Sequence, residues 1–273
     1  MEIFLNAEKV GHIGSFVITN TLVASSVVVF FLSMIGLMVY RSGYSLKNRF
    51  YNFVEMVIEG FMAFIEGVVG RGMVAKQIFG VIVTFFLFVI LNNWFGIFPG
   101  MGSIGFYEPR SLHETSTSEE SEESKEPQAP LTAEKIEKEE TIFIPLLRSA
   151  NSDLNMTLAI AIISVFFTQI ISIKNSGWKH YLSKFFNFAN PIMFFVGILE
   201  LISELVKIFS FSFRLFGNIF AGDVLLIVIF SLVPYLAPIP FMGIEMFAGF
   251  IQALIFSMLT LVFINVSVAH GEH

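Results

Sequence analysis

Long apolar stretches alternate with short polar ones along the chain. The apolar stretches lie at residues 22–40, 78–98, 154–173, 190–232 and 241–268. A helix needs about 20 apolar residues to cross a hydrocarbon core about 30 Å thick, and each stretch is long enough. The pattern predicts an all-α integral membrane protein with about five transmembrane helices, the last two forming a long, tilted C-terminal hairpin.

Residues 46–76 follow a different pattern. Polar positions fall on one helical face, with phenylalanines away from it; the polar positions are Asn48, Asn52, Glu55, Glu59 and Glu66. A helix with one charged face and one apolar face lies in the interface rather than across the bilayer. We expect an interfacial amphipathic helix here.

Residues 106–145 form an acidic segment with few apolar residues. Between residues 106 and 140 there are 11 Glu and four basic residues, a net charge of −7 in a chain of net charge −6. Such a composition does not bury enough apolar surface to fold on its own. We expect a mobile, solvated loop and assign it no partner.

The basic residues predict the orientation. They gather in residues 41–76 and 174–184, and Lys and Arg accumulate on the cytoplasmic side of a membrane. The N-terminus and the acidic loop are therefore expected outside and the C-terminus in the cytoplasm. No basic or Arg-rich leader precedes the first span, which favours a bacterial plasma membrane over an organelle inner membrane.

Several kinds of chemistry are excluded. The chain has no cysteine, so it can form neither disulfides nor thiolate metal sites. It has no phosphate-binding loop motif. We expect no cofactor, no metal, no directly bound nucleotide, no nucleic acid and no catalysis by this chain alone.

The fourth apolar stretch carries ionisable residues between positions 200 and 223. A charge at membrane depth costs several kcal/mol, and such residues mark ion pathways. At 100° per residue, one stripe contains Glu200, Ser203, Lys207, Ser210, Arg214, Asn218 and Ala221. Asp223 lies about 180° round from Arg214 and about 13 Å along the helix, while Glu200 lies about 21 Å the other way.

Arg214 is the central candidate. A guanidinium stays protonated and only donates hydrogen bonds, so it cannot relay a proton. It attracts a carboxylate at about 4 Å by about 4 kcal/mol at an effective dielectric of about 20. The alternative is that a neighbouring helix merely neutralises it. For Lys207, a structural ion pair with Glu204 is favoured because the two are three residues apart.

The last helix also carries polar residues, Glu245 and Gln252, seven positions apart. If the final two helices are antiparallel and Arg214 is level with Gln252, Glu245 lies close to Asp223. Two neighbouring carboxylates suit a proton relay. We also expect Gln252 to hydrogen-bond Arg214.

Four segments resemble one family: ITNTLVAS at 18–25, NSDLNMTLA at 151–159, ELISELVKIFSFSFRLFGNIFAGD at 200–223 and FIQALIFSMLTLVFI at 250–264. The sequence resembles subunit a of the F-type ATP synthase membrane sector, with RLFGNIFAG the most specific part. The resemblance implies a stator against a ring of proteolipid subunits (the c-ring), held with the peripheral-stalk b subunits in the complete ATP synthase.

The resemblance also implies residue roles. Arg214 separates two half-channels; the outer one includes Asn218, Asp223, Glu245 and Gln252, and the inner one Glu200, Ser203 and Ser210. Many members have Glu or His where Asp223 stands, and some have His where Glu245 stands, which leaves the relay open. The acidic loop is also longer than is usual in the family.

Two other functions compete with this reading. An independent secondary transporter or channel could use the same buried charges, but transporters usually show repeated halves, and only the C-terminal half here carries buried ions. A structural scaffold is the other alternative, and it predicts that the change Arg214→Ala is tolerated.

Overall fold

The computed structural model describes residues 9–13, 16–41, 49–70, 73–98, 104–109, 141–146, 148–185, 191–233 and 236–269. Their elements in chain order are β1 (Lys9–Ile13), β2 (Phe16–Thr19), α1 (Asn20–Arg41), α2 (Arg49–Val69), α3 (Met73–Ile97), β3 (Gly105–Pro109), β4 (Thr141–Pro145), the 3-10 turn η4 (Ala150–Ser152), α4 (Leu154–Ser176), α5 (Trp178–Phe185), α6 (Pro191–Leu232) and α7 (Pro238–Ala269).

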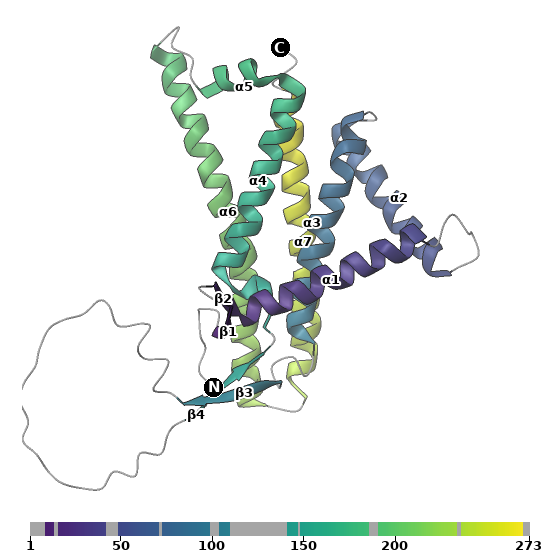
Figure 1. The fold of residues 1–273 in the computed structure, drawn as a ribbon, viewed down its shortest axis with the longest axis vertical. Helices are drawn as coiled ribbons and strands as arrows, with labels where there is room; N and C mark the ends of the chain where they lie inside the picture. Colours follow the sequence, from purple (N-terminus) through teal and green to yellow (C-terminus); the bar gives the residue numbers. More distant parts are fainter. Residues whose placement is uncertain are drawn as a thin grey trace, which may run out of the picture.

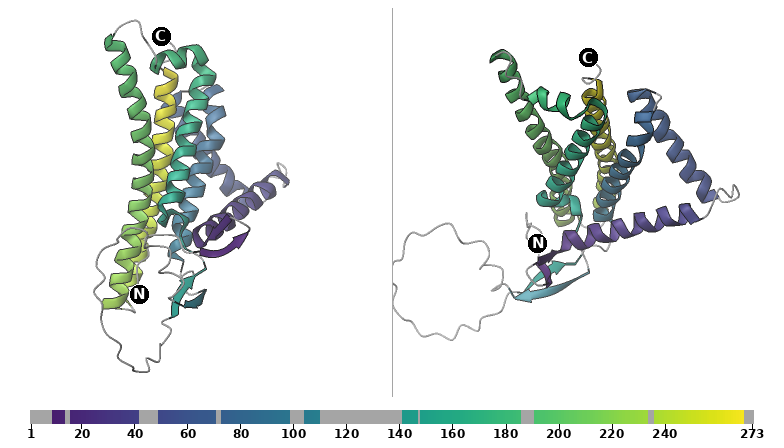
Figure 2. Two further views of the ribbon diagram at one scale, coloured as in Figure 1. Left: turned by 60° about the vertical axis from the view of Figure 1, so that its left-hand side comes forward. Right: turned by 45° about the horizontal axis from the view of Figure 1, so that its top comes forward.

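Helices α3, α4, α6 and α7 form a bundle (Figure 1). Helix α1 leaves this bundle at a wide angle, and α2 folds back from its far end to the beginning of α3, so α1, α2 and α3 outline a triangle (Figure 2). The antiparallel hairpins β1–β2 and β3–β4 lie at one end of the bundle, and α5 lies across the other.

In the described part of the chain, five helices are long and apolar enough to span a membrane: α1, α3, α4, α6 and α7. This confirms the predicted all-α membrane fold. Helix α6 has 42 residues and is therefore about 63 Å long, roughly twice the thickness of a hydrocarbon core. It must either tilt strongly in the bilayer or extend beyond it.

Aromatic rings and small hydroxyl groups hold the bundle together. The Phe256 ring packs against Phe211 at 5.0 Å and against Phe85 at 5.8 Å between centroids. Ser164 on α4 and Thr260 on α7 share a 2.8 Å hydrogen bond. Small hydroxyl side chains let helices approach closely and hydrogen-bond within a membrane, so α4 and α7 are fixed against each other.

A group of buried polar residues, the polar junction, joins four elements at the hairpin end: Thr21, Asn93, Asn151 and Asp153. Asn93 Nδ2 donates to the Gly249 carbonyl of α7 at 3.0 Å, and Asn93 Oδ1 accepts from Asn151 Nδ2 at 2.6 Å. Thr21 Oγ1 donates to Asp153 Oδ2 at 3.1 Å. The junction therefore ties the beginning of α1, the end of α3, η4 and α7 together.

Two glycines shape the chain around these elements. Gly96 lets Ser149 approach α3, because a Cβ there would lie 2.6 Å from Ser149 Cβ; Ser149 Oγ donates to the Asn92 carbonyl at 3.1 Å. Gly177 has φ +82°, which favours glycine, and it ends α4 so that α5 can begin at Trp178.

The observed elements differ from the expected ones in several places. The helix expected at 46–76 is α2, and α3 begins at Met73 rather than at 78, because Gly70 with φ +84° separates them. Both ends of the expected acidic loop pair as the strands β3 and β4, which corrects that prediction. Residues 110–140 lie outside the described residues. Helix α5 was not expected at all.

Candidate functional site

Arg214 lies on the exposed face of α6. On the inward face, Phe211, one turn before Arg214, and Leu215, the next residue, are buried at 2% and 0% exposure, whereas Arg214 is exposed. Within the described part of the chain, no hydrogen bond or ion pair involves its guanidinium. The described residues therefore include no neutralising partner for Arg214, and its role as a gate stays a prediction.

The face of α6 around Arg214 has no partner among the described residues. In the most apolar 18-residue stretch of α6 only 11% is buried, against 44% in the corresponding stretches of α3, α4 and α7. Ser203 and Ser210, two of the predicted inner residues, are exposed on this helix. Large apolar side chains accompany them: Val206, Phe209, Phe213, Leu225 and Val228.

Toward the α5 end, Glu204 and Lys207 form the expected ion pair, with Lys207 Nζ 2.8 Å from Glu204 Oε1. Lys207 Nζ also lies 4.8 Å from the centroid of the Phe263 ring on α7. An ammonium over an aromatic face is attracted to it. Lys207 thus connects α6 to α7, and Glu200 lies half-buried one turn beyond Glu204.

Toward the end of the bundle where the two β hairpins lie, Glu245 of α7 packs against α6. Its side chain is 8% exposed. A Cβ added at Gly222 of α6 would lie 2.7 Å from the Glu245 Cδ. The Asp223 carboxylate is close enough to act electrostatically on Glu245. The antiparallel register predicted from the sequence therefore brings these two carboxylates together.

Three amide and carboxylate atoms in this region are buried without a hydrogen-bond partner among the described residues. They are Asn218 Nδ2, Glu245 Oε2 and Gln252 Nε2. Buried polar groups are nearly always satisfied by protein or by ordered water. These three atoms therefore remain available to hydrogen-bond water.

The expected hydrogen bond between Arg214 and Gln252, both of which the structure describes, is not formed. Gln252 is 7% exposed and lies inside the bundle, whereas Arg214 extends from the outer face of α6. Placing two residues at the same position along antiparallel helix axes does not determine the direction in which each side chain points around its own helix. This prediction was wrong for that reason.

Sequence reasoning missed Arg148. It precedes η4, and its positive charge acts on the Asp223 carboxylate. The turn η4 packs against α6, which brings this cation to the hairpin end of the site. A lone arginine three residues before a helix-capping Asn-Ser-Asp run is the signal that could have identified it.

Gly222 gives a direct test of the Glu245 position. The change Gly222→Ala should displace the Glu245 carboxylate, because the added Cβ would come within 2.7 Å of Cδ. Small displacements of reacting groups cost up to about 100-fold in rate, so we expect ATP-driven proton pumping, the activity that the sequence resemblance implies, to fall about 10-fold or more in membrane vesicles, with the complex still assembled. Gly80→Ala, where a Cβ would meet nothing within 4 Å, is the control. Equal pumping by the two variants would contradict this placement of Glu245.

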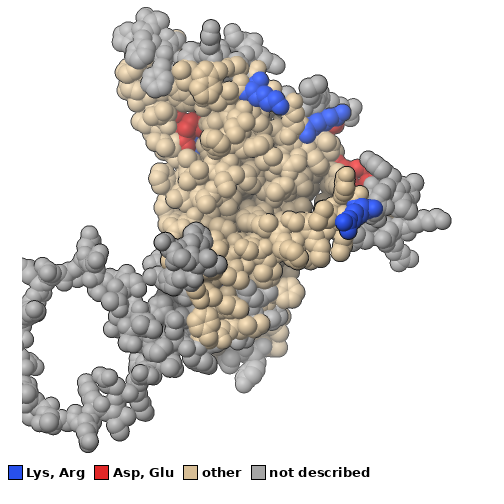
Figure 3. Space-filling view, viewed as in Figure 1, with Lys and Arg blue, Asp and Glu red and all other residues tan. Residues whose placement is uncertain are grey.

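No described group of three or more His, Cys, Asp or Glu residues is placed to hold a metal ion. On the face shown in Figure 3, the charged side chains that are described lie mainly in the half of the molecule nearer α5. The charges of the candidate site are therefore single side chains spread over α6, α7 and the segment before η4.

Comparison with known proteins identifies the family of the chain. The family model described as "ATP synthase A chain" matches residues 20–265. The ATP synthase subunit a of Syntrophobacter fumaroxidans is 26% identical over 97% of this chain and 91% of its own length. That of Geobacter sulfurreducens is 28% identical over 88% and 84%, and that of Campylobacter curvus is 40% identical over 48% and 58%. The chain therefore belongs to the ATP synthase A chain family, as a multi-pass, non-catalytic membrane subunit.

Proposed function

We propose that this chain, as the proton-translocating stator subunit of an F-type ATP synthase, separates two proton half-channels with Arg214. The observation that supports this role most strongly is the position of Arg214. It is a permanent cation, without a partner among the described residues, on an exposed helix face that has carboxylates on both sides of it along α6.

In the proposed outer half-channel, protons enter past Asp223 and Glu245 and move along Asn218 and Gln252. Their buried, unpartnered atoms supply binding positions for water. A proton then passes to a carboxyl group of the c-ring, which rotates. The proton leaves through the inner half-channel past Glu200, Ser203 and Ser210.

Arg214 prevents the two half-channels from exchanging protons directly. It has no dissociable proton at neutral pH, and its charge favours the ionised form of a ring carboxylate that arrives beside it by about 4 kcal/mol. Each elementary charge that crosses 100 mV releases about 2.3 kcal/mol. Separation of the half-channels is therefore what couples this energy to rotation.

The unpartnered face of α6 is the proposed contact with the c-ring. Its apolar side chains would otherwise meet lipid, while the charge of Arg214 would have no counterion there. We further propose that peripheral-stalk b subunits and the remaining ATP synthase subunits complete the assembly in a bacterial plasma membrane. The N-terminus and the hairpins then lie outside and the C-terminus in the cytoplasm, in line with the basic segments.

Thiol labelling tests the two half-channels separately, because the chain has no native cysteine. In the assembled complex, Ser203→Cys should react with a membrane-impermeant methanethiosulfonate reagent only from the inner face, and Asp223→Cys only from the outer face. Right-side-out and inverted vesicles distinguish the two. Ile163→Cys, on the exposed apolar surface of α4 at 58% exposure, is the control and should react from neither side.

Reaction of both test cysteines from the same face would contradict two separate half-channels. Equal reaction of Ile163→Cys would show that the reagent reaches the lipid-facing surface, and labelling would then give no support to either channel. The family match argues against an independent transporter, and the Arg214 variants described in the Discussion test the scaffold alternative.

A further inference from the structure

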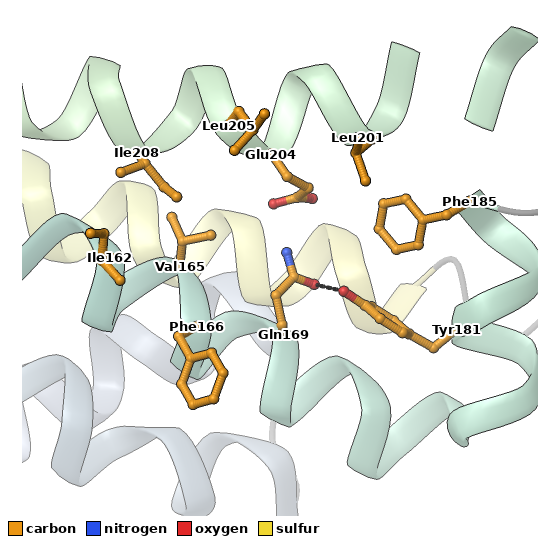
Figure 4. Close-up of a pocket in the computed structure, with 10 residues that line it drawn as sticks. All are labelled: Ile162, Val165, Phe166, Gln169, Tyr181, Phe185, Leu201, Glu204, Leu205 and Ile208. Atoms are coloured by element: carbon orange, nitrogen blue, oxygen red, sulfur yellow. Dashed lines mark hydrogen bonds between the residues drawn. The ribbon is translucent and has the colours of Figure 1, made fainter. Parts of the chain in front are cut away.

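A groove of about 380 Å³ lies between α4, α5 and α6, along the part of α6 that also carries Glu200 and Ser203 of the proposed inner half-channel. Its walls are apolar, with Ile162 and Val165 from α4 and Leu201 and Leu205 from α6 among them (Figure 4). Several wall residues also face outward, including Ile162 at 46% and Leu205 at 53% exposure. The groove is therefore open to the surroundings of these spans, which in the membrane are lipid.

One end of the groove is polar and is formed by Gln169, Tyr181 and Glu204. The Tyr181 hydroxyl donates to Gln169 Oε1 at 2.6 Å, and the Gln169 amide nitrogen points toward Glu204 (Figure 4). Glu204 Oε1 accepts from Lys207, but Glu204 Oε2 is buried with no partner among the described residues. This end thus has an acceptor that lacks a donor.

Two carboxylates act on the polar end. Burial, followed by the charges of Glu204 and Glu200, raises the pKa of Tyr181 above its ordinary value. Both carboxylates therefore act on the Tyr181 hydroxyl of α5. A carboxylate in a weakly solvated site is stabilised by a further charged donor, so the polar end favours a cation that carries N–H groups.

The shape of the groove excludes a simple metal ion and favours a cation with an apolar body. Mg²⁺ and Ca²⁺ need six or more oxygen ligands, whereas this groove is lined mainly by hydrocarbon. A site of 300–1,000 Å³ with apolar walls and a few placed polar groups is typical of an organic ligand. The ligand should carry its charge at one end.

Helix α5 indicates where that ligand comes from. It is an eight-residue helix lying across the end of the bundle, and Trp178 at its beginning is 63% exposed. Tryptophan favours the interface between lipid headgroups and hydrocarbon. A lipid beside α5 would therefore have its headgroup at the polar end and an acyl chain along the apolar walls.

We propose that the groove between α4, α5 and α6 binds a phosphatidylethanolamine molecule, whose primary ammonium hydrogen-bonds Glu204 and whose acyl chain lies between α4 and α6. Phosphatidylcholine lacks an N–H donor and phosphatidylglycerol lacks a cation, so neither satisfies Glu204 in this way. This lipid site lies beside Glu200 and Ser203 of the proposed inner half-channel, but lipid retention by it does not depend on the role of Arg214.

Native mass spectrometry of the purified full chain tests the site with three phospholipids that share the same acyl chains. Wild type should retain phosphatidylethanolamine about 10-fold better than phosphatidylcholine or phosphatidylglycerol, the ratio that one charge-assisted hydrogen bond supports. Glu204→Gln should remove this preference. Glu59→Gln, which changes an exposed glutamate of α2, should keep it.

A second pair of variants tests the groove itself and covers the case in which Glu204→Gln fails to fold. Leu205→Trp should fill the groove and reduce retention of phosphatidylethanolamine about 10-fold, whereas Leu225→Trp, an exposed position of α6 outside the groove, should not. Retention of all three lipids to the same extent, or a wild-type preference that survives both Glu204→Gln and Leu205→Trp, overturns the proposal. Loss in Leu205→Trp alone would show an acyl-chain site without headgroup recognition, and it too overturns the assignment to Glu204.

Discussion

Replacing Arg214 with alanine is expected to abolish ATP-driven proton pumping while the complex still assembles. The attraction of about 4 kcal/mol that the guanidinium exerts on a nearby carboxylate corresponds to about a 1,000-fold change in equilibrium. Because Arg214 is exposed and has no partner among the described residues, its removal leaves no buried charge unpaired. Fluorescence quenching of an acridine dye in inverted vesicles measures the pumping, and immunoblotting measures assembly.

Arg214→Lys should fail as well, although it keeps the positive charge. An ammonium lacks the planar set of donors and can lose its proton when it is desolvated. Lys174→Ala, which removes an exposed cation from the last turn of α4, is the control and should pump normally. Pumping by Arg214→Ala at more than about one tenth of the wild-type rate would support the scaffold alternative.

Replacing Asn93 with leucine is expected to destabilise the folded chain strongly. The Asn93 side chain is 1% exposed, donates to the Gly249 carbonyl and accepts from Asn151. Loss of both bonds leaves two buried groups short of a partner, each at a cost of about 1–3 kcal/mol. A thermal-shift assay on the purified chain should show Tm lowered by about 10 °C, given about 2–4 °C per kcal/mol for chains of this size.

Asn265→Leu provides the matched comparison for Asn93. Asn265 lies on α7 and donates one 3.2 Å hydrogen bond to the Val68 carbonyl, and its side chain is only half-buried. Its loss should lower Tm by less than half as much. If the two variants had equal Tm values, the polar junction would not be a special source of stability.

The spans and the register of the last two helices could be predicted because both depend on periodic patterns. Glu245 lies beside Asp223 as expected. The separations of seven residues from Glu245 to Gln252 and of nine from Arg214 to Asp223 give positions along the two antiparallel helix axes without any knowledge of packing. The ion pair of Lys207 with Glu204 could likewise be predicted from three-residue spacing. These features follow from helix geometry alone.

The contacts that could not be predicted join residues far apart in sequence. Arg148 acts on Asp223 because η4 packs against α6, and Asn93 reaches Gly249 across 156 positions. The missing hydrogen bond from Arg214 to Gln252 has the same origin, because the rotation of each helix about its own axis depends on the whole bundle. Helix α5 was missed because eight residues with several lysines resemble a loop in composition.

The wide angle of α1 has a mechanical consequence. Its buried residues all belong to its first nine positions, from Asn20 to Val28, and the rest of the helix extends away from the bundle. Helix α1 is thus held to the bundle at one end only, and a force on its free end acts as a torque on the packed end. Thr21 transmits that torque to Asp153, and the short segment from Asp153 to Asn151 leads to Asn93 and the backbone of α7. A force applied to the free end of α1 is therefore transmitted to α7, the helix that carries Glu245.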